Sequence, residues 1–85
     1  MRPRVPARRP AVTPGDVRER LVAGWPRLML AKFTSDHDCA AFFGRTRQTG
    51  SYWRSGHCKP DGPAVALAWA VWPEDCARMI LGGAA

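Results

Sequence analysis

The stretch SDHDCAAFFGRTRQTGSYWRS, residues 35–55, decides the fold that we expect for this chain. Ser35 can accept a hydrogen bond from an unpaired first-turn amide, and Asp38 stands at the capping-box position three residues later. A helix is therefore predicted from Asp36 to Phe43. Its apolar residues recur at spacings of three and four, which gives a single buried stripe made of Cys39, Ala40, Phe42 and Phe43.

A turn and a second short helix should follow. Gly44 can adopt the left-handed backbone conformation that ends a helix, and Thr46 can cap the next one. This second helix should run from Arg47 to about Arg54 and stop at Gly56, with Trp53 as its inward residue. Its outward side chains are polar or aromatic and include no carboxylate: Arg47, Gln48, Ser51, Tyr52 and Arg54.

This pattern resembles the helix-turn-helix of the phage-repressor and Cro family, whose members have the lambda-repressor-like fold. The matching residues are Ala40, Gly44 and Trp53, with Thr46, Gln48 and Thr49 between the last two. The resemblance implies that the small residue lets the helices approach, that the glycine makes the turn, and that the second helix enters the major groove of DNA. It is close over residues 35–55 and looser around them.

The stretch departs from the family pattern at two positions. Arg45 follows the turn glycine where the family usually has a buried aliphatic residue, and Gly50 stands where a valine or isoleucine normally packs inward. Glycine lowers helix propensity by about 1 kcal/mol relative to alanine. We therefore expect a second helix that is weak by itself. Either Trp53 and a partner aromatic residue fill the space beside Gly50, or the motif has drifted away from DNA.

The resemblance also implies roles for individual residues. Arg47 and Gln48, with Ser51 and Tyr52 one turn later, should contact base edges. Arginine can bind guanine, and glutamine can bind adenine, through two hydrogen bonds each. Phosphate contacts are expected from a second group of residues, namely Arg45, Thr46, Thr49, Arg54 and Lys59.

The charge of the chain is concentrated at its N-terminus. The 85 residues include 13 basic and 7 acidic ones, a net charge of +6, which favours a polyanionic partner. Residues 1–13 are rich in proline and arginine and are predicted to be disordered. They are either a basic arm that contacts DNA, or a solvated tail, or residues added by an over-long choice of start codon. The arm would use Arg2, Arg4, Arg8 and Arg9.

Residues 14–85 predict a single all-α domain of four to five short helices in a lambda-repressor-like bundle. A helix should begin near Pro14, and because Pro26 lacks an amide donor we expect a break near Gly24 and a new helix over 26–33. A further helix should have Pro63 at its first position and run to about residue 72. The last should begin at residue 73 and end at the glycines 82 and 83.

A domain this small has a marginal core unless it is well packed or shared with a partner. The last helix carries three apolar residues in a row, Met79, Ile80 and Leu81. We therefore predict a symmetric homodimer formed through the C-terminal helix, which would suit a two-fold operator on DNA.

Metal and catalytic sites are not predicted. His37, Cys39, His57 and Cys58 are metal-binding residue types, but their spacing is not that of a zinc site. Ser51 or Ser55 can be grouped with His57 and Asp61 by residue type alone. We therefore expect no metal, no cofactor and no enzymatic activity.

The longest uncharged run, residues 63–73, is too short to span a bilayer, and three cysteines without a signal peptide suggest reduced thiols. We therefore expect a cytoplasmic protein that is not membrane-bound.

The predicted function is sequence-specific binding of double-stranded DNA by a small transcriptional regulator, of phage or mobile-element type, that reads the major groove with residues 47–54. The alternative is a protein-binding module, such as a phage-encoded inhibitor of a host defence complex, that keeps the fold but does not use it on DNA.

Overall fold

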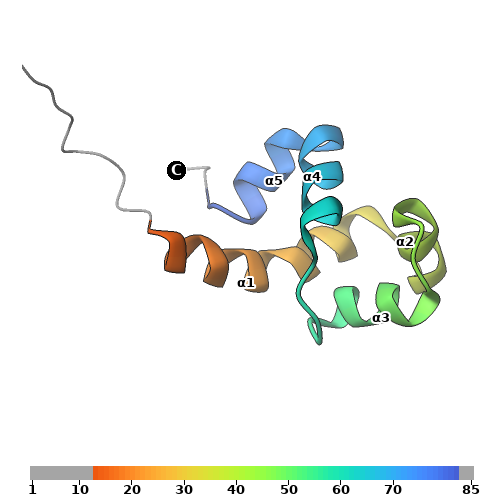
Figure 1. The fold of residues 1–85 in the computed structure, drawn as a ribbon. Coiled ribbons are helices and arrows are strands. Elements are labelled where there is room, and N and C mark those ends of the chain that lie inside the picture. The colour runs from red at the N-terminus through yellow and green to blue at the C-terminus, as the bar shows by residue number, and fades with distance from the viewer. Residues whose placement is uncertain (1–12, 83–85) are drawn as a thin grey trace, which may run out of the picture.

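The computed structural model describes residues 13–82, which form five helices and no strand (Figure 1). They are α1 (Pro14–Lys32), α2 (Asp36–Phe43), α3 (Arg47–Ser55), α4 (Gly62–Val71) and α5 (Pro73–Met79). The predicted all-α class is thus confirmed. Residues 1–12, with the four arginines of the predicted arm, lie outside the described residues.

Helix α1 connects two pairs of helices. It packs against α3 and against α5, while α2 packs on α3 and α4 packs on α5. Figure 1 shows α1 as the longest helix, with α2 and α3 gathered around its C-terminal part and α4 and α5 on another side. None of the described helices is both long enough and apolar enough to cross a membrane.

The start of α1 is set by a capping box. The Thr13 hydroxyl accepts a hydrogen bond from the amide of Asp16 at 3.1 Å, and the Thr13 amide donates to the Asp16 carboxylate at 3.2 Å. These two bonds satisfy donors that would otherwise be unpaired at the helix end. Thr13, which we assigned to the arm, therefore belongs to the folded domain.

The predicted break at Pro26 is wrong, because α1 continues through this residue to Lys32. Trp25, Leu28 and Met29 are fully buried on both sides of the proline. The proline ring also lies against the turn after α3, where a Cβ placed on Gly56 would be 3.3 Å from Pro26 Cγ. Proline removes one helical hydrogen bond and its ring crowds the carbonyl four residues earlier, but the burial on either side of it keeps the helix continuous.

The predictions for α2 and α3 are confirmed at nearly every boundary. Ser35 accepts a hydrogen bond from the Asp38 amide at 3.0 Å, and Thr46 accepts one from the Thr49 amide at 3.2 Å. Gly44 and Gly56 end the two helices in the left-handed conformation, with φ of 67° and 84°. The only difference is that α3 extends one residue further than expected, to Ser55.

Aromatic rings form the centre of the core. The ring of Trp25 lies 5.8 Å from that of Phe43 and 5.6 Å from that of Trp53, measured between centroids. Phe42, which we predicted to be buried with its neighbours, is instead 39% exposed and stacks on Trp72 at 5.0 Å. Its side chain bridges α2 to the junction of α4 and α5.

The C-terminal helices differ from the prediction in three details. Helix α5 ends at Met79 and not at the glycines 82 and 83, and Ile80 is its C-cap. Helix α4 begins one residue early, at Gly62, because the Asp61 carboxylate caps it by accepting a hydrogen bond from the Ala64 amide at 3.0 Å. Ile80, predicted to lie in a dimer interface, is only 3% exposed and belongs to the core. It is buried because Gly24 lets α1 and α5 approach closely. A Cβ on Gly24 would lie 2.8 Å from Ile80 Cα.

Candidate nucleic-acid interface

Helices α2 and α3 touch at Gly50. A Cβ placed on Gly50 would lie 2.5 Å from the carbonyl oxygen of Asp36 and 3.1 Å from the Ala40 Cβ. The expected space beside Gly50, to be filled by Trp53 and another aromatic ring, does not exist, because the backbone of α2 occupies it. Gly50 therefore lowers the helix propensity of α3 but allows α2 and α3 to approach closely. The small side chain of Ala40 permits the same approach.

Trp53 anchors the inner side of α3. Its side chain is 2% exposed and forms edge-to-face pairs with Trp25 and Phe43, at centroid distances of 5.6 and 5.2 Å. The indole Nε1 donates to the carbonyl oxygen of Lys59 at 3.3 Å, which ties the loop after α3 to the helix. A buried Trp with its N–H satisfied fixes the rotation of α3 about its own axis.

The outer face of α3 carries the side chains that we predicted to contact bases. Arg47 and Gln48 are exposed, Tyr52 is 37% exposed, and Ser51 is half-buried. Gln48 Nε2 donates to the Tyr52 hydroxyl at 2.7 Å. Within the described residues, Arg47 has no ion-pair partner, so its guanidinium is open to a ligand.

Two of the arginines predicted to contact phosphates are held in ion pairs. Arg45 makes a two-pronged pair with Asp61, at 2.6 Å for Nη1–Oδ2 and 3.0 Å for Nη2–Oδ1, and lies over the Trp53 ring. Arg54 Nη1 lies 2.6 Å from Asp36 Oδ1. The first pair fixes the turn before α3 to the start of α4, and the second fixes α3 to the start of α2. Each carboxylate offsets the positive charge of its arginine.

The Arg45–Asp61 pair shifts the pKa values of both partners. Hydrogen bonds from the Arg45 guanidinium, and then from the Ala64 amide, lower the pKa of Asp61 to about 2. The hydrogen bond to Asp61 raises the pKa of Arg45 above its ordinary value. Both effects favour the charged forms, so the pair is intact at neutral pH.

The remaining predicted phosphate contacts lie at the two ends of α3. Thr46 uses its hydroxyl as the cap of α3, and that oxygen lies 3.1 Å from the hydroxyl oxygen of Thr49. Lys59 is exposed in the loop after α3 and has no ion-pair partner among residues 13–82. Arg47 and Lys59 are thus the two cations of residues 45–59 that have no ion pair in the described structure.

The residues weighed for catalysis come together only in part. The Ser55 hydroxyl lies 2.8 Å from His57 Nδ1, and the His57 ring stacks on Tyr52. Asp61, the third residue of that group, is bound to Arg45 and to the Ala64 amide instead. Within residues 13–82 no carboxylate orients the imidazole, so the arrangement required of a nucleophile, base and orienting acid is incomplete.

The residues weighed for metal binding are dispersed. Cys39 is fully buried against the sulfur of Met29 at 3.6 Å, and burial raises the pKa of its thiol to about 11. His37, His57 and Cys58 are exposed. The part of the chain that the structure describes has no group of three potential metal ligands.

The acidic partners Asp36 and Asp61 were missed as parts of this site. They lie 18 and 16 residues from their arginines, and neither separation is a spacing that brings side chains together on one helix. Comparisons with protein-family models, with curated proteins and with solved structures find no match for this chain.

Proposed function

We propose that this protein binds double-stranded DNA in a sequence-specific manner through the outer face of α3, as a small transcriptional regulator of phage or mobile-element type. The observation that carries the proposal is the exposure of Arg47, Gln48 and Tyr52 side by side on a helix whose inner face is fixed by Trp53. Side chains that can read bases are useful only on a helix whose orientation is fixed.

The hydrogen bond from Gln48 to Tyr52 supports a preference for adenine. One amide hydrogen of Gln48 is donated to the Tyr52 hydroxyl, which leaves the second hydrogen and the carbonyl oxygen free. These are the two groups that glutamine uses on N7 and N6 of adenine. Tyr52 would act as a positioning residue for Gln48, while Arg47 would bind guanine.

Phosphate contacts in this proposal come from Lys59, from the threonines 46 and 49, and from the arginines of the N-terminal arm. Arg45 and Arg54 would contribute less than we expected from the sequence, because their guanidinium groups are shared with carboxylates. Removing residues 1–12 should flatten the salt dependence of DNA binding, by roughly 0.9 in slope for each phosphate that the arm neutralises in the parent.

A homodimer is part of the proposal, with a changed interface. Because Ile80 is in the core, we propose that two copies meet through the outer face of α4, where Leu67 and Val71 are exposed and no residue is charged. Two domains of net positive charge can approach there without like-charge contact. Sedimentation of the parent and of Leu67→Glu at about 100 μM tests this, since association depends on concentration; a monomeric parent contradicts it.

Fluorescence anisotropy on DNA selected from a random library tests the proposed function. Arg47→Ala and Gln48→Ala should each weaken binding to the selected site by about 1–3 kcal/mol and relax the preference at one base pair. Lys59→Ala should weaken selected and random DNA equally. If the Arg47 and Gln48 variants bind as the parent does, α3 does not read DNA.

A protein-binding module is the second candidate, and the ion pairs favour it. Arg45 and Arg54 are neutralised by Asp61 and Asp36, which leaves only two cations without an ion pair among residues 45–59 of the described structure. Salt separates the two candidates: DNA affinity should fall steeply between about 50 and 200 mM salt, by roughly 10³–10⁵ for six to ten phosphate contacts. A salt-insensitive complex with a protein, together with no DNA selected, would favour the second candidate.

A further inference from the structure

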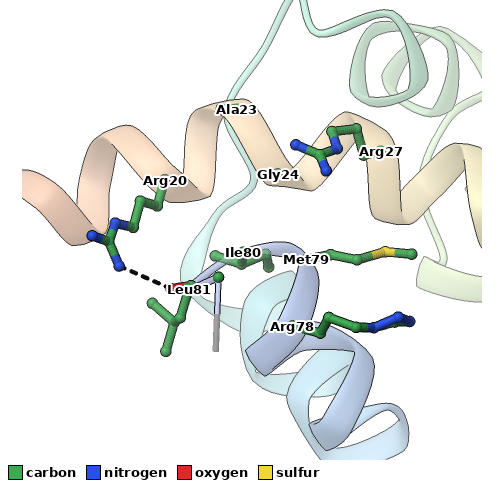
Figure 2. A pocket seen from close by; sticks show the side chains of 9 residues that line it. Arg20, Ala23, Gly24, Arg27, Arg78, Met79, Ile80 and Leu81 are labelled. Atoms are coloured by element: carbon green, nitrogen blue, oxygen red, sulfur yellow. Dashed lines mark hydrogen bonds between the residues drawn. The ribbon is translucent and has the colours of Figure 1, made fainter. Parts of the chain in front are cut away.

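A groove of about 320 Å³ lies between the middle of α1 and the C-terminal end of α5 (Figure 2). Its volume is within the range of small-molecule sites. Gly24 brings the two helices into contact beneath it, since a Cβ there would lie 2.4 Å from the carbonyl oxygen of Met79. The groove is therefore built on a fixed junction of two helices.

Three arginines line this groove, and no carboxylate is among its lining residues. Figure 2 shows Arg20 and Arg27 two turns apart on α1, with Ala23 and Gly24 between them and Arg78 on α5. A concentration of cations in a concave surface raises the local concentration of anions. The charge of the groove thus points to an anionic ligand.

Two of the three arginines already have roles in the fold. Arg20 Nη1 donates to the carbonyl oxygen of Leu81 at 2.8 Å, and Arg78 Nη2 lies 2.5 Å from Asp75 Oδ1. Cations near the C-terminal end of a helix stabilise it, which explains these two. The Arg27 guanidinium makes no side-chain hydrogen bond and no ion pair within residues 13–82. Neither helix capping nor ion pairing therefore accounts for an arginine at this position.

We propose that the groove binds the phosphate group of a small phosphate monoester. Guanidinium groups match the oxygens of phosphate through parallel hydrogen bonds. Figure 2 shows the three guanidinium groups apart, with Arg78 directed away from Arg20. The phosphate is therefore assigned to Arg27, and the other two arginines add to the positive potential of the groove. Met79 and Leu81, which are half-buried, supply apolar surface for the organic part of the ligand. No residue of α3 lines the groove, so this site is separate from the proposed DNA-reading face.

Isothermal titration calorimetry with adenosine monophosphate tests the proposal. The parent should bind it saturably at one site, and adenosine, which has the same organic group without phosphate, should not bind measurably. Inorganic phosphate should bind more weakly than the monophosphate, since it makes no contact with the apolar part of the groove. Equal binding of adenosine and its monophosphate overturns the proposal, as does a parent that binds neither.

Arg27→Ala should weaken binding by about tenfold or more, because hydrogen bonds to charged groups contribute about 1.5–3 kcal/mol. Arg27→Lys should fall between this variant and the parent, since lysine keeps the charge but loses the planar fork. Arg18→Ala removes a charge from the same helix outside the groove and should stay within about twofold of the parent. Thermal melts should show all three variants folded, because both residues are exposed.

Two results would overturn the assignment of the groove. Equal loss of binding in Arg27→Ala and Arg18→Ala would mean that the affinity for the monophosphate depends only on the net charge of the protein. Displacement of the monophosphate by a short DNA duplex, in the parent and in Arg47→Ala alike, would mean that the groove contacts the DNA backbone. Retained binding of the monophosphate in the presence of duplex supports the proposal.

Discussion

The α2–α3 pair and the α1–α5 pair each place a glycine where two helices touch, yet the sequence predicts the first pair far better than the second. Helices α2 and α3 are neighbours in the chain, and each end carries a cap of its own, such as Ser35 or Gly44. Helices α1 and α5 are far apart in sequence, and Gly24 meets Met79 and Ile80 only after folding. Local hydrogen-bonding signals locate helices, whereas contacts between distant helices decide which of their faces are free.

Replacing Gly50 with valine should give the largest loss of stability. The valine is the residue type that the repressor pattern favours here, but its Cβ would meet the backbone of Asp36 at 2.5 Å. Overpacking usually costs about 1–3 kcal/mol, and we expect more than about 3 kcal/mol because backbone must move. Urea denaturation measures the effect.

Gly15→Val is the matched control for this change. A Cβ at Gly15 makes only an ordinary contact, 3.7 Å from the Thr13 hydroxyl oxygen, so its effect should stay within about 0.5 kcal/mol. If Gly50→Val is as stable as Gly15→Val, the close approach of α2 and α3 is not what holds this pair together.

Gly24→Ala tests the α1–α5 junction in the same way. The new Cβ would lie 2.4 Å from the Met79 carbonyl oxygen, and we expect a loss of about 1–3 kcal/mol as α5 is displaced. The loss should be smaller than for Gly50→Val, because α5 is a short helix near the end of the domain and can shift. Urea denaturation again gives the difference.

Gly15→Ala provides the reference for helix α1. A Cβ there makes only an ordinary contact, 3.7 Å from the Thr13 hydroxyl oxygen. Its stability should equal or slightly exceed that of the parent. Equal stabilities for the variants at positions 15 and 24 would contradict the tight junction, and hydrogen exchange confined to α5 would locate any loss.

The ion pair between α2 and α3 should have a smaller effect. Asp36→Ala removes the partner of Arg54, whose side chain is only 21% exposed, and should cost about 1 kcal/mol. Asp38→Ala removes an acidic residue from the same first turn of α2, so it controls for the helix dipole. Equal thermal melts for the two variants would show that the Arg54 pair contributes nothing.

The Arg45–Asp61 pair should produce the smallest effect, visible only in acid. Because the pKa of Asp61 in the folded protein is about 2, below its ordinary value of 3.8, the pair stabilises the fold above pH 3.8 and loses this contribution as the pH falls toward 2. Asp61→Asn keeps a side chain that can cap α4 but cannot ionise. Its stability should therefore fall less steeply than that of the parent over this window.

Acid titrations followed by circular dichroism measure this difference, with Asp38→Asn as the control. Parallel titration curves for the parent and Asp61→Asn would mean that the carboxylate is not held ionised by Arg45. A steeper fall of stability with pH in Asp61→Asn than in the parent would contradict the lowered pKa of Asp61.

Some of the candidate site could be predicted from sequence because its signals are local. Gln48 and Tyr52 are four residues apart, a spacing that brings side chains together on a helix, and their exposure follows from the inward position of Trp53. The pairing of Arg54 with Asp36 and of Arg45 with Asp61 could not be predicted, because each joins residues on different elements.

The sequence by itself determined the all-α class, the caps of α2 and α3 and the inward side of α3, since each depends on hydrogen bonds and periodicity within a few residues. Only the tertiary structure decided that α1 runs through Pro26, that Ile80 is buried and that Gly50 faces the backbone of α2. These outcomes depend on packing between segments distant in the chain, where burial outweighs a lost helical bond or a low helix propensity.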